Sequence, residues 1–197
     1  MVSDTGSAIM LLGPPGAGKT TVGAALAARL GLPFVDTDEL VERLDGRPVS
    51  LILIDDGEQR FRELEREAVS TALAGPPAVV ALGGGAVLDA GVRAALAGHT
   101  GVFLDVGLRD AARRTGFDTG VALMALNPRG QWLALMEARR PLYEAAAALR
   151  IDTSGRTADE VLEEIVAALD QAHKQDLDQA HEQASGGGSP QNREEQA

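Results

Sequence analysis

Residues 8–30 read AIMLLGPPGAGKTTVGAALAARL, in which a glycine-rich turn joins an apolar run to a segment of helical period. Residues 13–20 of this stretch match G-x-x-x-x-G-K-[ST], with the strand before it and the helix after it that the motif requires. Glycines let the backbone N–H groups point into a concave nest, and the following helix adds the positive end of its dipole there. The stretch therefore predicts a phosphate-binding loop, against the alternative of a glycine-rich turn without function.

The loop predicts a site for ATP with Mg²⁺ as the cofactor. We expect Lys19 to bridge the β- and γ-phosphates and the Thr20 hydroxyl to ligate the metal, which prefers oxygen ligands. Of the 18 basic residues only Lys19 and Lys174 are lysine, and Lys174 lies in the polar C-terminal segment. In the apparent folded body, a compact ammonium therefore stands only where phosphate chemistry requires one. The expected nucleotide contacts in the loop are Gly13, Gly16, Ala17, Gly18, Lys19, Thr20 and Thr21.

Apolar runs of strand length alternate with segments of helical period, which indicates a parallel sheet covered on both faces. The expected strands are residues 8–12, 33–36, 78–82, 101–105 and 148–152. The expected helices are about 19–30, 57–74, 107–115, 128–140 and 157–172, the fourth ending at Pro141 and the last beginning with a Thr157–Glu160 capping box. We expect a three-layer α/β/α domain over residues 1–170 and an acidic, flexible tail over residues 171–197.

The charge and composition of the chain exclude several classes of partner. A net charge of -11 and a pI near 4.7 oppose binding to nucleic acid, which requires clustered basic residues. The chain has no cysteine, so neither a disulfide framework nor a thiolate metal site is expected. No apolar run approaches the roughly 20 residues of a membrane span, and the opening MVSDTGS lacks a signal pattern. We therefore expect a cytoplasmic monomer without membrane contacts.

A second polar group follows the second expected strand, where Asp36-Thr37-Asp38 ends the run PFVD. The carboxyl ends of parallel strands face the ligand crevice in α/β sheets. We expect Asp36 to hold Mg²⁺ through a water and Asp38 to orient a substrate hydroxyl as a catalytic residue. The alternative is an Asx turn or a helix N-cap, which uses the same residue types.

Seven segments in order resemble shikimate kinase across residues 8–170: GPPGAGKTT, DTDEL, GRPVSLILIDDGEQRFRELE, ALGGGAV, RRTG, MEARRPLY and IDTSGRT. The resemblance implies the nucleoside-monophosphate-kinase-like P-loop fold, with a five-stranded parallel sheet of order 2-3-1-4-5. It also implies transfer of the ATP γ-phosphate to the 3-hydroxyl of shikimate, a step towards chorismate and the aromatic amino acids.

The resemblance also implies an acceptor pocket and an adenine site. Two guanidiniums suit the carboxylate of shikimate and an aspartate suits its hydroxyls, while glycines allow the backbone to approach the ring. We expect Glu65 to hold Arg62 by an i,i+3 contact. The alternative for the arginines is a surface salt bridge, and the alternative for the glycines is a flexible turn without function. The implied acceptor residues are Asp38, Arg62, Gly83, Gly84, Gly85 and Arg139, and the implied adenine neighbours are Arg114 and Arg156.

The chain departs from the family in the segment expected to form a lid. Val121-Ala122-Leu123-Met124 stands where the family usually has Arg-Pro-Leu-Leu, and Leu53 stands where a phenylalanine is common. The missing arginine normally reaches the transferring phosphate, where a guanidinium accelerates phosphoryl transfer. Three accounts stay open. Arg129 replaces the missing arginine; the acceptor or the regulation differs, as in a kinase for another small polyol or cyclitol; or the chain is a non-catalytic nucleotide-binding homologue.

Overall fold

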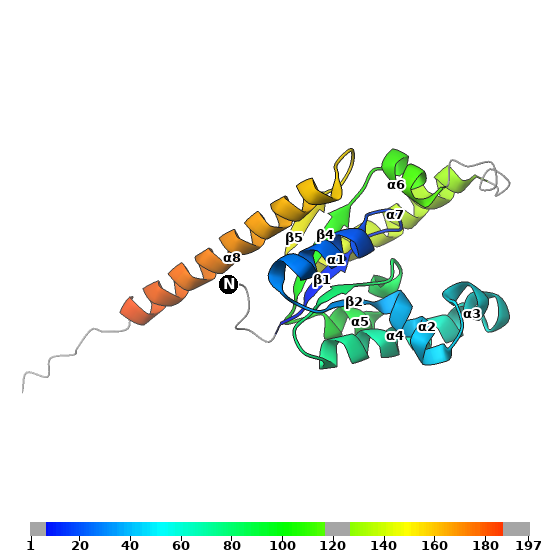
Figure 1. Cartoon of the computed structure of the whole chain (residues 1–197), viewed down its shortest axis with the longest axis horizontal. Helices are drawn as coiled ribbons and strands as arrows, with labels where there is room; N and C mark the ends of the chain where they lie inside the picture. The colour runs from blue at the N-terminus through cyan, green and yellow to red at the C-terminus, as the bar shows by residue number, and fades with distance from the viewer. Residues whose placement is uncertain (1–6, 117–126, 187–197) are drawn as a thin grey trace, which may run out of the picture.

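The computed structural model describes residues 7–116 and 127–186, and within them five strands form one parallel sheet of order β2-β3-β1-β4-β5 (Figure 1). This order and the parallel pairing confirm the expected fold, and helices flank the sheet, with α1 packed beside α8. The strands are β1 Ile9–Leu12, β2 Phe34–Asp36, β3 Val79–Ala81, β4 Thr100–Asp105 and β5 Leu149–Asp152.

The helices agree with the sequence pattern where that pattern is long and periodic. The helices at 19–30 and 57–74 begin and end as expected, whereas the short helices α2, α3, α5 and the 3-10 turn η1 were not predicted. The helices are α1 Lys19–Leu30, α2 Thr37–Asp45, α3 Val49–Asp55, α4 Gly57–Ala74, η1 Ala86–Leu88, α5 Ala90–Ala95, α6 Leu108–Thr115, α7 Pro128–Ala146 and α8 Ala158–Gly186.

Two expected helix ends were wrong. α7 continues through Pro141 to Ala146. A proline leaves the carbonyl four residues earlier without its N–H donor, and Glu137 lies on the exposed face, where water can satisfy that carbonyl. The last helix does not fray near residue 172 but runs to Gly186 (Figure 1), because residues 158–185 contain many strong helix formers and neither glycine nor proline.

The start of α8 is fixed by the expected capping box. The Glu160 carboxylate accepts from Thr157 N at 2.8 Å, and Glu160 N donates back to the Thr157 hydroxyl at 3.3 Å. One face of the helix then buries Val161, Ile165 and Leu169 against the main core. The division into a domain and an acidic tail at residue 170 remains a prediction. No helix in the described part of the chain is both long and apolar enough to cross a bilayer.

The core of the molecule is the middle of the sheet. All four residues of β1 and all three of β3 are buried, and β4 is buried from its second residue onward. Strands covered by helices on both faces must be apolar throughout, which explains the unbroken runs in the sequence. Because β1, β2 and β3 are neighbours, the segments that follow their carboxyl ends meet at one edge of the sheet, where the candidate site lies.

Candidate active site

The phosphate loop connects β1 to α1 and has the backbone shape that its glycines predict. Gly13, Gly16 and Gly18 have positive φ angles of 144°, 81° and 95°. A side chain at Gly13 would also place a Cβ 2.5 Å from the Leu104 carbonyl oxygen of β4. The loop therefore requires glycine for both its conformation and its close approach to the sheet.

Lys19 is the first residue of α1, and its ammonium lies inside the loop. Its Nζ donates to the carbonyl oxygens of Gly13 at 2.8 Å and Pro14 at 3.1 Å. Although the residue as a whole is half-buried, burial of the ammonium lowers the pKa of Lys19 to about 8, against the opposing pull of Asp38 and Asp36. An ammonium with few water contacts gains strongly from an incoming phosphate, which is the chemistry expected of this lysine.

Asp36 ends β2 and makes two contacts at once. Its Oδ2 accepts from the Thr20 hydroxyl at 2.9 Å, and its Oδ1 accepts from the Asp38 backbone N–H at 3.0 Å. The second contact is the N-cap of α2, so the capping alternative is confirmed, while the metal role of Asp36 stays a prediction. The first contact places a hydroxyl and a carboxylate together, which are the hard oxygen donors that Mg²⁺ prefers.

The described residues contain no cluster of three or more His, Cys, Asp or Glu side chains able to hold a metal ion. Thr20 and Asp36 fit an ion that arrives with its own phosphate and water ligands, because Mg²⁺ in phosphoryl-transfer sites retains waters and few protein ligands.

Two carboxylates converge on Gly83, directly after Leu82 at the end of β3. A Cβ at Gly83 would lie 2.6 Å from Glu65 Oε1 and 2.8 Å from Asp38 Oδ1. The Gly83 N–H donates to the Thr37 hydroxyl at 2.9 Å, and the Thr37 side chain is fully buried. Sequence reasoning assigned no role to Thr37, although its place inside Asp-Thr-Asp was a signal that it lies at this edge.

The electrostatics of these carboxylates differ from those of surface acids. Burial, with the Asp36 charge beside it, raises the pKa of Asp38, while Lys19 opposes the rise. Burial also raises the pKa of Glu65, opposed by its hydrogen bond from Arg62. Acids held in this way are suited to accept or orient hydroxyl protons.

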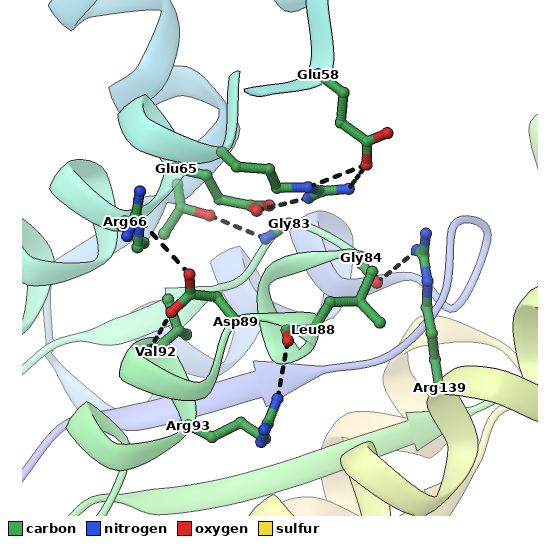
Figure 2. A network of polar contacts seen from close by, with 12 residues as sticks. Glu58, Glu65, Arg66, Gly83, Gly84, Leu88, Asp89, Val92, Arg93 and Arg139 are labelled. Atoms are coloured by element: carbon green, nitrogen blue, oxygen red, sulfur yellow. Dashed lines mark hydrogen bonds and ion pairs between the residues drawn. The ribbon is translucent and has the colours of Figure 1, made fainter. Parts of the chain in front are cut away.

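Arg62 lies over the turn formed by Gly83, Gly84 and Gly85, the glycine turn, and is held from two sides. Its Nη1 donates to Glu65 at 2.6 Å, which confirms the expected i,i+3 contact, and its Nη2 donates to Glu58 at 3.0 Å (Figure 2). Its guanidinium lies where a Cβ at Gly85 would fall. The Arg62 side chain is 24% exposed and Glu65 only 2%, so the inner pair is the fixed one.

Arg139 reaches the same turn from α7. Its Nη1 donates to the Gly84 carbonyl oxygen at 2.8 Å (Figure 2). The Tyr143 hydroxyl donates to the same oxygen at 2.5 Å, a contact that sequence reasoning missed although Tyr143 lies one helical turn beyond Arg139. The next residue, Arg140, is instead paired bidentately with Asp105. The structure thus separates the two neighbouring arginines, and only Arg139 faces the glycines.

Arg114 and Arg156 line a hollow of about 140 Å³ beside the phosphate loop. Arg114 donates to the Gly16 carbonyl at 3.1 Å and to the Thr153 carbonyl at 2.6 Å, so it ties the loop to the turn after β5. Arg156 donates to the Glu160 carbonyl at 2.8 Å. Their position suits a base attached to a phosphate chain, while the stacking of Arg114 on adenine stays a prediction.

A cleft of about 360 Å³ lies between the phosphate loop and the residues that follow β2. It is lined by Lys19 and Thr20 at the start of α1, by Asp36 at the end of β2 and by Asp38 on α2. The structure therefore brings together the residues expected for phosphate, metal and acceptor hydroxyl, and the glycine turn gathers the two expected arginines. The altered lid residues, Val121 to Met124, lie outside the described residues.

Comparison with known proteins agrees with this geometry. A family model described as shikimate kinase matches residues 15–170. The shikimate kinase of Salinispora arenicola is 53% identical over 160 residues, covering 81% of this chain and 96% of the relative, and that of Streptomyces coelicolor is 52% identical over 162 residues, covering 82% and 93%. The shikimate kinase from Acinetobacter baumannii, solved in complex with shikimate, superimposes with a TM-score of 0.78 at 33% identity, covering 84% of this chain and 94% of that one. With its loop, its paired arginines and this similarity across most of its length, the chain belongs to the shikimate kinase family.

Proposed function

We propose that the protein transfers the γ-phosphate of ATP to the 3-hydroxyl of shikimate. The observation that carries the proposal is the cleft in which Lys19 and Thr20 face Asp36 and Asp38, beside a glycine turn that holds Arg62 and Arg139. Phosphoryl transfer requires positioning and charge stabilisation more than covalent chemistry, and this arrangement supplies both.

The nucleotide half of the reaction belongs to the phosphate loop. The backbone N–H groups of the loop and the α1 N-terminus bind the phosphates, and the Lys19 ammonium neutralises the charge that develops during transfer. Mg²⁺ supplies further neutralisation of the phosphate oxygens when it is bound, and Thr20 and Asp36 are the residues that would hold it. Arg114 and Arg156 border the hollow proposed for adenine.

The acceptor half belongs to the residues around the glycine turn. Arg62 and Arg139 present forked donors that match a carboxylate, and Asp38 accepts from the hydroxyl that attacks the phosphorus. The raised pKa of Asp38 favours its taking a proton as the new P–O bond forms. A neutral polyol would bring no negative charge to Arg62 and Arg139, so the arrangement favours a hydroxylated acid over a neutral polyol.

A coupled assay of ADP release tests the proposal. We expect ADP formation that depends on both MgATP and shikimate, with the product identified as the 3-phosphate by ³¹P NMR. A panel of cyclic polyols with and without a carboxylate tests specificity, and faster turnover of the neutral polyols would overturn the choice of acceptor. Binding of MgATP and shikimate by calorimetry without ADP release would instead identify a non-catalytic homologue.

A further inference from the structure

The hydroxyl of Tyr143 is a buried polar group with no part in the reaction as described above. Tyr143 is 1% exposed, and its ring stacks on Phe103 with the centroids 5.1 Å apart. The hydroxyl and Arg139 Nη1 both donate to the Gly84 carbonyl oxygen, at 2.5 Å and 2.8 Å. Two donors therefore share one carbonyl oxygen. One of these donors, Arg139, is also expected to bind the carboxylate of the substrate.

The glycine turn is the point where the two halves of the site meet. A Cβ at Gly84 would lie 3.1 Å from Pro15 Cδ of the phosphate loop, so the two loops are in close contact. On either side, Gly83 is bonded to Thr37 and Gly85 faces the Arg62 guanidinium. Movement of the Gly84 carbonyl would therefore disturb both the loop and the acceptor pocket.

We infer that Tyr143 is a positioning residue that keeps the Gly84 carbonyl satisfied and thereby frees Arg139 to bind the carboxylate of the acceptor. The inference rests on the proposed function. When Arg139 turns towards the acceptor, the carbonyl keeps its Tyr143 partner and the turn stays in place. Without that hydroxyl, the departure of Arg139 would leave a half-buried carbonyl oxygen unpaired, which is unfavourable.

The surroundings of Tyr143 keep its hydroxyl protonated, so that it can donate a hydrogen bond at all times. Burial raises the pKa of Tyr143 to about 12, although the nearby Arg139 charge opposes the rise. The hydroxyl therefore keeps its proton throughout the neutral pH range. The place of Tyr143 on α7 and its 2.5 Å hydrogen bond direct the hydroxyl at the Gly84 carbonyl.

Tyr143→Phe is the test variant, because it removes the hydroxyl and keeps the stacked ring. We expect the KM for shikimate to rise about tenfold, the size of one lost hydrogen bond, while the KM for ATP changes less than about twofold. In an Arg139→Ala background, the same change should alter the KM for shikimate less than about twofold, because no guanidinium remains to be released. Phe103→Leu is the matched control: it removes the stacking partner and keeps the hydroxyl, so it should lower the melting temperature with little change in either KM.

A measurement without substrate separates this inference from the proposed function. ¹⁵N relaxation of the Gly83, Gly84 and Gly85 amides should show greater mobility in Tyr143→Phe than in the wild type, because Arg139 alone, instead of two donors, then holds the Gly84 carbonyl. An unchanged KM for shikimate, an equal rise in both KM values, or unchanged amide relaxation would each overturn the inference. If the wild type does not phosphorylate shikimate, the proposed function fails, and the relaxation result still decides whether Tyr143 positions the turn.

Discussion

Gly83→Ala should disable the acceptor site while leaving the nucleotide site intact. The new methyl carbon would lie 2.6 Å from Glu65 Oε1 and 2.8 Å from Asp38 Oδ1, where ordinary contact begins at 3.4 Å. The two carboxylates must therefore shift by 0.8 and 0.6 Å, the differences between these values and 3.4 Å. Gly83 is not among the glycines with positive φ, so its backbone accepts alanine and the effect comes from the side chain alone.

Displacement of a catalytic group by about 1 Å can reduce a rate about 10²-fold. We therefore expect kcat/KM for shikimate to fall about 100-fold, which corresponds to about 2.7 kcal/mol of lost transition-state stabilisation. The KM for ATP should change little, because the methyl group points at the carboxylates rather than at the phosphate loop. Overpacking should also lower the free energy of unfolding by about 1–3 kcal/mol, so the assay is run well below the melting temperature.

Gly75→Ala is the matched control for this experiment. Gly75 follows α4 with a φ of -79°, and the nearest atom to a new Cβ is the Ala72 carbonyl oxygen at 3.5 Å. This variant should keep wild-type kinetics in the coupled ADP-release assay. A Gly83→Ala enzyme within about threefold of wild-type kcat/KM, or an equal loss in Gly75→Ala, would refute the convergence of the two carboxylates on the turn.

Three further predictions concern the charged groups of the site. Lys19→Met should abolish turnover with a loss of unfolding free energy of about 1 kcal/mol or less, measured by coupled assay and thermal melt; retained turnover would contradict its role. Because burial lowers the pKa of Lys19 to about 8, the ammonium is charged below that pH and neutral above it, so the KM for ATP should rise as pH increases from about 7 to about 9; a flat profile would contradict this. Glu65→Gln should raise the KM for shikimate about tenfold by weakening the 2.6 Å bond to Arg62. Glu58→Gln, at a side chain that is 72% exposed, should raise it much less. Equal effects of the two variants would refute the view that Glu65 positions Arg62 more than Glu58 does.

The parts of the fold that could be predicted from the sequence are those determined by residues close together in the chain. The phosphate loop, α1 and α4 each depend on residues close in the chain, and the strands were placed within one residue at each end because they are short apolar runs with sharp limits. The helix α2 was missed because Asp36-Thr37-Asp38 was interpreted for its chemistry, although Asp36 also caps that helix. The helix α3 was missed because seven largely apolar residues without a side-chain cap carry no clear helical signal.

The contacts that organise the acceptor site join distant segments, which limits what sequence alone can predict. Thr37 bonds to Gly83 across 46 residues, and Tyr143 bonds to Gly84 across 59 residues. No spacing rule connects such pairs, since only the sheet order brings their segments together. Glu65 and Arg62 lie one helical turn apart, so their contact was predictable from the helix period alone.

The central claim is that nucleotide binds at Lys19 and that a hydroxylated carboxylic acid binds beside it at Arg62 and Arg139. Calorimetric titration of the wild type and of Arg139→Ala with shikimate, and separately with MgATP, tests it most directly. We expect Arg139→Ala to weaken shikimate binding at least about tenfold and MgATP binding less than about twofold. Equal weakening of both ligands, or undiminished shikimate binding, would contradict the account.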